Sequence, residues 1–173
     1  MNQKVIIDIV FEDLEKTRNK LLATLQNSSD KIFEKRFDHK WNAPEIVGHL
    51  YRFEDEVTGY FMNFIISSSP KAQPEFSGKR LSQAWLDSMN NDNEKYQVPE
   101  LFIPERVLKE EYAEKLKKSR EKLHGAVYSK MSYDFSKIIV PHPNGVKLNL
   151  VQWLELLSVH EKRHIRQLEH LAV

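Results

Sequence analysis

The stretch from Asn149 to Leu171 decides the fold, and it reads NLVQWLELLSVHEKRHIRQLEHL. Apolar residues and one histidine recur in it every three or four positions, which is the spacing of one face of an α-helix. The members of this stripe are Leu150, Trp153, Leu154, Leu157, His164, Leu168 and Leu171. The pattern predicts a long amphipathic helix whose apolar face packs against a core.

Two histidines lie on this face, four residues apart. At about 100° per residue, the side chains of His160 and His164 differ by roughly 40° around the helix axis, so both point toward the core. Imidazoles in an apolar interior need polar partners, and a divalent metal ion is a strong candidate. His49 lies on the apolar stripe of another predicted helix and would complete a three-histidine site.

The composition fits one soluble domain that spans residues 1–173. The chain has 26 Lys and Arg against 25 Asp and Glu, so its net charge of +1 gives no electrostatic reason to expect nucleic acid or an anionic membrane as partner. There is no cysteine, which excludes disulfides, thiolate metal sites and a cysteine nucleophile. The first residues do not resemble a signal peptide, and no apolar run reaches about 18 residues. We therefore expect a cytoplasmic protein.

Three further long helices are predicted before the last one. The first runs from Val5 to Gln26. The second follows Asn42, which can cap it, with Pro44 in the first turn and Glu45 at the capping-box position. Its apolar stripe extends to Phe64. A third is predicted from near Pro104 to about His124, with Leu108 among its inward-facing residues and an unusually charged surface.

Two irregular segments separate these helices. Residues 70–104 contain four prolines and a glycine, and they form a long irregular connection between the second and third long helices. Gly125 to Lys147 is predicted to be a loop that leads into the last helix. Solvation is the preferred interpretation of the histidines on loops and helix ends, which are His39, His124, His142 and His170. For His142, a position over one end of the bundle is kept open as an alternative. Four long amphipathic helices with one long connection predict an all-α four-helix bundle.

Other interpretations of the histidines were weighed. Any one of them alone is better explained as a core histidine that hydrogen-bonds its neighbours. The sequence from His160 to His164 is also a literal H-E-x-x-H, the pattern of zinc proteases. The extended protease pattern needs a glycine where this chain has Gln167, and on a continuous helix His170 is rotated roughly 80° from His160. A metal site built from three helical histidines is therefore favoured over a protease site.

Two polar residues are candidates for a supporting role. Gln167 shares the face of the two histidines and could hydrogen-bond a ligand histidine or metal-bound water, although an ordinary polar position at the helix edge explains it equally well. Glu161 borders the stripe. It could accept a proton from metal-bound water, but a solvated salt-bridge partner is the favoured interpretation.

The chain resembles the DinB/YfiT-like superfamily of metal-binding four-helix bundles. Trp41 to Leu50 matches the family's W-x-x-x-E-x-x-x-H-L at the second helix. Trp153-Leu154, followed by His160 to Gln167, matches its closing W-L…H-E-x-x-H-x-x-Q, and His142 to Gly145 is similar to the H-P-x-x-G before that helix. The combination of motifs extends over nearly the whole chain.

The resemblance implies a site in which His49, His160 and His164 hold zinc, nickel or another divalent ion. It also implies an up-down-down-up bundle that forms homodimers. Characterised relatives include transferases and isomerases that use low-molecular-weight thiols such as bacillithiol or mycothiol, and others are described as metal-dependent hydrolases.

Three functional hypotheses follow from the residues and the resemblance. The first is an S-transferase in which the metal binds a low-molecular-weight thiol and makes it a nucleophile toward a small-molecule substrate. The absence of cysteine fits a nucleophile that comes from outside the chain. The alternatives are a metal-dependent hydrolase and a non-catalytic metal-binding module for stress or interaction.

Overall fold

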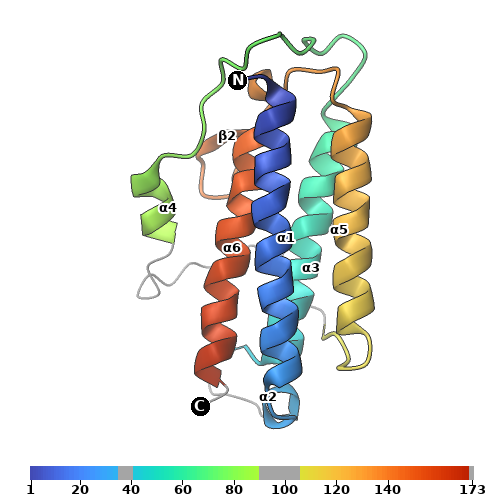
Figure 1. Ribbon diagram of the computed structural model, residues 1–173, viewed down its shortest axis with the longest axis vertical. Helices are drawn as coiled ribbons and strands as arrows, with labels where there is room; N and C mark the ends of the chain where they lie inside the picture. Colours follow the sequence, from blue (N-terminus) through green and yellow to red (C-terminus); the bar gives the residue numbers. More distant parts are fainter. Residues whose placement is uncertain (35–40, 90–105, 172–173) are drawn as a thin grey trace.

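The protein is predominantly helical in its computed structural model, which describes residues 1–34, 41–89 and 106–171. Within these residues, four long helices form a bundle (Figure 1): α1 (Gln3–Asn27), α3 (Ala43–Asn63), α5 (Tyr112–Ser129) and α6 (Leu150–Leu171). The shorter elements are α2 (Lys31–Glu34), α4 (Gln83–Met89), the 3-10 helix η2 (Phe135–Lys137), β1 (Ile139–Pro141) and β2 (Lys147–Asn149). The predicted all-α four-helix bundle is confirmed.

The four long helices have two directions. In Figure 1, α1 and α6 run from top to bottom, whereas α3 and α5 run from bottom to top. α1 packs beside α6, and α3 packs beside both α5 and α6. Because α3 and α5 are parallel, the chain must return along the length of the bundle between them. This is the up-down-down-up order, and the returning segment is the predicted long connection.

α3 begins where the sequence predicts. The side chain of Asn42 accepts a hydrogen bond from the backbone N–H of Glu45, and the Glu45 carboxylate accepts one from the backbone N–H of Asn42. Pro44 occupies the first turn, where a missing N–H leaves no helical hydrogen bond unmade. This reciprocal cap fixes the first turn and therefore the direction in which His49 leaves the helix less than two turns later.

The third long helix begins later than predicted. The expected start near Pro104 lies outside the described residues, and α5 begins at Tyr112. Val107 is buried, but its backbone N–H donates to the carbonyl of Pro44, so this segment packs against the start of α3 without helical geometry. Leu108, which was predicted to face inward, is 60% exposed. The charged pattern of this region gave no signal for the true helix start.

The segment predicted as a loop from Gly125 to Lys147 contains regular structure. α5 continues through Gly125 to Ser129, and β1 and β2 form an antiparallel hairpin in which Val140 pairs with Leu148. Gly145 has a φ of 89° in the hairpin turn, a conformation that L-residues with a side chain rarely adopt. β2 leads directly into α6, so the hairpin is held at the start of that helix.

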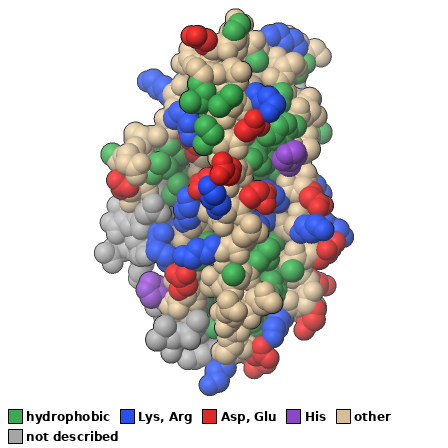
Figure 2. Space-filling view, in the orientation of Figure 1, with side chains coloured by type: hydrophobic (Ala, Val, Ile, Leu, Met, Phe, Trp, Pro, Cys, Tyr) green, Lys and Arg blue, Asp and Glu red, His purple; other side chains and the backbone are tan. Residues whose placement is uncertain are grey.

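Buried aromatic and aliphatic residues fill the bundle. Trp153 is fully buried, and its Nε1–H donates to the carbonyl of Val140 at 3.0 Å, which attaches the hairpin to α6. Phe64 was predicted to belong to the apolar stripe of α3, but it is 48% exposed because the helix ends at Asn63. Across the described ranges, no helix is long and apolar enough to cross a membrane. Figure 2 shows basic and acidic side chains interspersed over one face of the molecule.

Candidate metal centre

The three histidines singled out from the sequence meet between α3 and α6. The Nε2 atom of His49 is 2.9 Å from the Nε2 atom of His160, which is 3.2 Å from the Nε2 atom of His164. One ligand nitrogen from each ring lies within 4.8 Å of the others. The structure therefore brings the two α6 rings and the α3 ring to a common point.

Two of the three nitrogen–nitrogen separations suit the ligands of one metal ion. Two nitrogens that are each about 2.0–2.1 Å from an ion lie roughly 3.3 Å apart in tetrahedral geometry and about 2.9 Å apart at a right angle. The observed 2.9 and 3.2 Å match that range. Hydrogen bonds between the rings could not satisfy all three nitrogens, because each N–H pairs with only one lone pair. A cation at the centre would satisfy all three nitrogens together.

Gln167 orients one of the three rings. Its Oε1 lies 2.7 Å from the Nδ1 atom of His164. Because an amide oxygen only accepts, the proton of His164 is on Nδ1, and the Nε2 lone pair points toward the other two rings. The supporting role considered for Gln167 thus matches the observed contact. In His160, the buried Nδ1 has no hydrogen-bond partner among the described residues, so the polar contacts of this ring are made by Nε2 alone.

Aromatic side chains surround the three rings. Trp41 lies 4.7 Å from His49 and stacks on His164, and Phe53 lies 4.3 Å from His160, measured between ring centroids. His49 and His164 are each 5% exposed, whereas part of His160 remains accessible. The rings are therefore held among apolar groups.

The environment keeps the two α6 histidines neutral. Burial lowers the pKa of His160 well below its ordinary value of 6.5, and the neighbouring His164 and His49 lower it further. Burial also lowers the pKa of His164 well below 6.5, with His49 as the next cause, although the hydrogen bond to Gln167 acts in the opposite direction. Neutral imidazole is the form that binds a metal ion, so at pH 7 both lone pairs are available.

Comparison with known proteins identifies the family. A family model described as the DinB superfamily matches residues 13–168, a range that contains all three histidines. The chain belongs to the DinB superfamily. The "Uncharacterized protein YuaE" of Bacillus subtilis (strain 168) is 24% identical over 146 residues, which cover 83% of this chain and 85% of that relative. No solved structure matches the chain.

In this DinB-superfamily bundle, Glu161 lies away from the histidines. It is 2% exposed, and its carboxylate accepts hydrogen bonds from Thr17 Oγ1 at 2.6 Å and Arg18 Nε at 2.7 Å. The predicted solvated salt-bridge partner is therefore wrong. Glu161 follows His160 by one residue, so its side chain is rotated by about 100° around the axis of α6 and enters the space between α6 and α1.

Glu161 belongs to a buried charge cluster with Arg18, Glu54 and Arg120. Arg18 donates to Glu54 at 2.9 Å, and Arg120 donates to Glu54 at 2.6 Å and lies 3.5 Å from Glu161. Burial alone would raise the pKa of Glu54, but the two arginines outweigh it and hold the pKa below the ordinary 4.5. Each long helix contributes one member. The sequence analysis missed this cluster, although Arg18 stands at helical spacing between Leu14 and Leu21.

The other histidines have separate surroundings. His124 is exposed on α5 and stacks on Tyr128, with 4.2 Å between ring centroids, and His170 is exposed near the end of α6. Solvation was predicted for both. His39, for which solvation was also predicted, lies outside the described residues. His142 is partly buried in the turn of the β1–β2 hairpin, where its ring lies 5.3 Å from that of Trp153.

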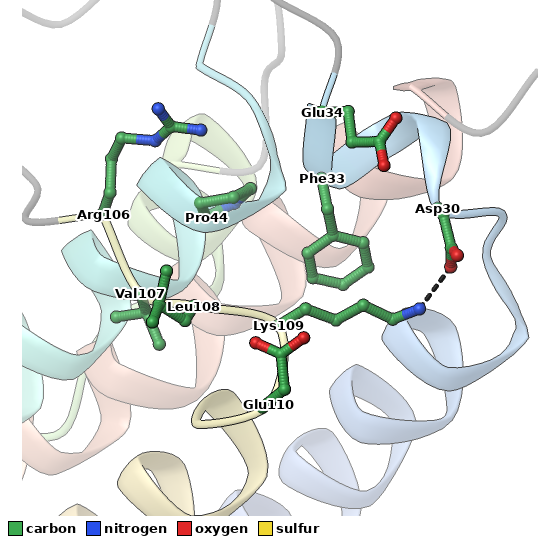
Figure 3. Close-up of a pocket in the computed structure, with 9 residues that line it drawn as sticks. All are labelled: Asp30, Phe33, Glu34, Pro44, Arg106, Val107, Leu108, Lys109 and Glu110. Carbon is green, nitrogen blue, oxygen red and sulfur yellow. Dashed lines mark hydrogen bonds and ion pairs between the residues drawn. The ribbon is translucent and has the colours of Figure 1, made fainter.

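A hollow of about 490 Å³ lies near α2, beside the segment that precedes α5. Figure 3 shows Lys109 extending beneath Phe33 to pair with Asp30. Both signs of charge line this hollow, and none of the three clustered histidines does. It is therefore separate from the candidate metal centre, and its lysine already has a carboxylate partner.

Proposed function

We propose that this DinB-superfamily protein is a metal-dependent enzyme that transfers a low-molecular-weight thiol to an electrophilic small molecule. The observation that supports it is the convergence of three imidazole nitrogens, with Nε2 separations of 2.9 and 3.2 Å. Three protein ligands leave a coordination position open, which is the arrangement of catalytic rather than structural metal sites.

Each residue has a role in this proposal. His49, His160 and His164 hold the ion, for which zinc and nickel are the best candidates on a three-imidazole site. Gln167 keeps the Nε2 lone pair of His164 directed at the centre through its 2.7 Å hydrogen bond. Trp41 screens His49 and His164 from water. When bound, the ion lowers the pKa of a coordinating thiol, so that the thiol reacts as a thiolate at neutral pH.

The source of the nucleophile follows from composition. The chain contains no cysteine, so the sulfur must come from a diffusible thiol. Glu161, the carboxylate nearest to His160 in sequence, accepts hydrogen bonds from Thr17 and Arg18. These contacts hold it in the charge cluster and away from a role as general base, so hydrolysis at this site would rely on the ion alone to activate water.

The first experiment combines metal analysis with an activity assay. The purified protein is analysed for bound metals and assayed with bacillithiol or mycothiol and the electrophile 1-chloro-2,4-dinitrobenzene. We expect one divalent ion per chain and thiol-dependent release of chloride. His49→Ala should abolish both while the helical circular dichroism signal persists. His124→Ala, which changes an exposed histidine of α5, should alter neither.

Other outcomes would contradict the proposal. Stoichiometric metal with hydrolysis of ester substrates and no thiol transfer would indicate a metal-dependent hydrolase. Metal whose removal unfolds the protein, with no turnover of either substrate class, would indicate a non-catalytic metal-binding module. The homodimer and the cytoplasmic location implied at the sequence level stay predictions, and analytical ultracentrifugation would test the first.

A further inference from the structure

His142 lies on the same side of α6 as the three clustered histidines. Its ring is 5.3 Å from that of Trp153, which precedes His160 by two helical turns. Seven residues return the helix to nearly the same direction and advance it by about 10.5 Å along its axis. Phe53 bridges the interval, since its ring is 6.1 Å from Trp153 and 4.3 Å from His160. A row of rings therefore connects His142 to the metal centre.

His142 is not a fourth member of the histidine cluster. Among the described residues, only His49, His160 and His164 bring their ring nitrogens together, and no ring contact joins His142 directly to any of them.

The hairpin holds His142 rigidly. The backbone N–H of His142 donates to the carbonyl of Val146 at 2.7 Å, and its carbonyl accepts from Gly145 at 2.8 Å. The strands are attached to α6 by the 3.0 Å hydrogen bond from Trp153 to Val140. The position of the imidazole is therefore set by the same helix that positions two of the clustered histidines.

One nitrogen of His142 is left available. Its Nδ1 atom is 2.7 Å from the Oδ1 atom of Asn144, and that oxygen also accepts from the backbone N–H of Val146 at 3.2 Å. Because an amide oxygen only accepts, this short contact places the proton on Nδ1, in preference to the longer 3.3 Å contact in which the backbone N–H of Asn144 would donate to Nδ1. Nε2 then keeps its lone pair. No group within the described residues hydrogen-bonds this Nε2, and the side chain is partly exposed. His142 thus presents a fixed hydrogen-bond acceptor, about two helical turns from the candidate metal centre.

We propose that His142 is a substrate-recognition residue that accepts a hydrogen bond from a hydroxyl or amino group on the thiol bound at the three-histidine site. This inference rests on the proposed function and narrows its substrate class. The thiol carries a hydrogen-bond donor several bonds from its sulfur, so that the sulfur reaches the centre while the donor reaches Nε2. The rings of Trp153 and Phe53 are buried between His142 and the centre, and they set the distance that the intervening part of the molecule must span.

A series of synthetic probes tests both the donor and its distance from the sulfur. The protein is loaded with cobalt(II), whose sulfur-to-metal charge-transfer band reports thiol binding without any turnover. ω-Mercaptoalkanols of two to eight carbons are titrated beside their O-methyl ethers, which can accept a hydrogen bond but not donate one. At one chain length we expect the alcohol to bind about three- to tenfold more tightly than its ether, the effect of one hydrogen bond.

Matched variants assign that preference to His142. In His142→Ala the alcohol and the ether should bind equally at every length, while cobalt affinity stays unchanged. His142→Gln, which keeps an accepting oxygen, should recover part of the preference. Asn144→Ala keeps the ring but removes the partner that fixes its proton, so it should weaken the preference. His124→Ala should behave as the unmodified protein.

The outcomes separate the two proposals. If thiols produce the charge-transfer band but the alcohols and ethers never differ, the role of His142 is overturned while the proposed function stands. The same holds if the difference survives in His142→Ala. If no thiol produces the band on a protein that binds cobalt, the proposed function fails, and the role of His142 fails with it.

Discussion

His160 and Glu161 are adjacent in α6, yet their side chains enter two regions of opposite character. At the metal centre, three imidazole nitrogens converge within 4.8 Å, and the outer nitrogen of His160 is buried without a partner among the described residues. In the charge cluster, Glu54 and Glu161 are each bound by both arginines. The first region has lone pairs to share with a ligand, whereas the second has its charges satisfied internally.

The two regions therefore differ in role: the charge cluster holds the helices together, and the metal centre is able to bind a ligand. Buried charges that are fully paired hold helices together but offer nothing to a substrate. Buried imidazoles with converging lone pairs are costly unless something binds them, and so they indicate a ligand. Because one helix supplies both regions, substitutions on α6 and its neighbours can test each region while the other stays intact.

The largest effect is expected at the metal centre. His160 makes both of the short Nε2 contacts, so His160→Ala should weaken zinc binding on the order of a thousandfold or more. A competition titration with a chromophoric chelator measures this affinity, and His170→Ala is the matched control on the same helix. Unchanged zinc affinity in His160→Ala would show that the convergence of the rings does not hold an ion.

A substitution in the charge cluster should lower the stability of the protein and leave its metal binding in place. Glu54→Ala leaves two buried arginines without one of their carboxylates, so the free energy of unfolding should fall by about 3 kcal/mol or more. Urea denaturation measures it. Asp55→Ala, next to it on α3, removes an exposed partner of Lys122 and should cost less than about 1 kcal/mol. At temperatures where Glu54→Ala is folded, it should still bind zinc stoichiometrically, and loss of zinc there would mean that the two regions are not separable.

A smaller effect is expected at Gln167. Gln167→Ala removes the acceptor that fixes the proton of His164, so zinc affinity should fall by about 10- to 100-fold. The same chelator competition measures the loss. Glu169→Ala, an exposed substitution two residues further along α6, serves as control and should leave zinc affinity unaltered. Equal zinc affinities in the two variants would show that Gln167 has no supporting role at the metal centre.

The smallest and most gradual effect is expected in the pH dependence of the free energy of unfolding. His160 and His164 have pKa values lowered below 6.5 in the folded protein, so the unfolded chain binds more protons once the pH falls below about 6.5. The metal-free protein should therefore lose stability on acidification through this range, by up to about 1.4 kcal/mol per pH unit for each ring. The lowered pKa of Glu54 acts in the same direction only below about 4.5.

Urea denaturation at successive pH values measures this dependence. The contribution of the two neutral rings to the free energy of unfolding is fully present above pH 6.5. It is lost as the pH falls toward the lowered pKa values of His160 and His164. Replacing both rings, in His160→Ala/His164→Ala, should flatten the profile between pH 6.5 and 5 and leave the decline below 4.5 in place. A double variant with the original slope would assign the acid sensitivity to other groups.

Much of the fold was predictable because local signals were strong. The capping box at Asn42 and Glu45 placed the start of α3, and the apolar stripe from Leu150 onward placed α6. α5 was misplaced because its exposed face is densely charged and its start has no side-chain cap. The hairpin was missed because its two strands are short and a proline lies at the end of β1.

The sequence by itself determined which histidines share a helix face, because helical geometry places residues four apart in nearly the same direction. It also determined that the chain forms a bundle of amphipathic helices. Only the tertiary structure decided that His49 reaches the α6 pair, that Glu161 turns instead to Arg18, and that His142 lies beside Trp153. These contacts join residues far apart in the chain, and they depend on how helices rotate and pack against one another, which no local spacing specifies.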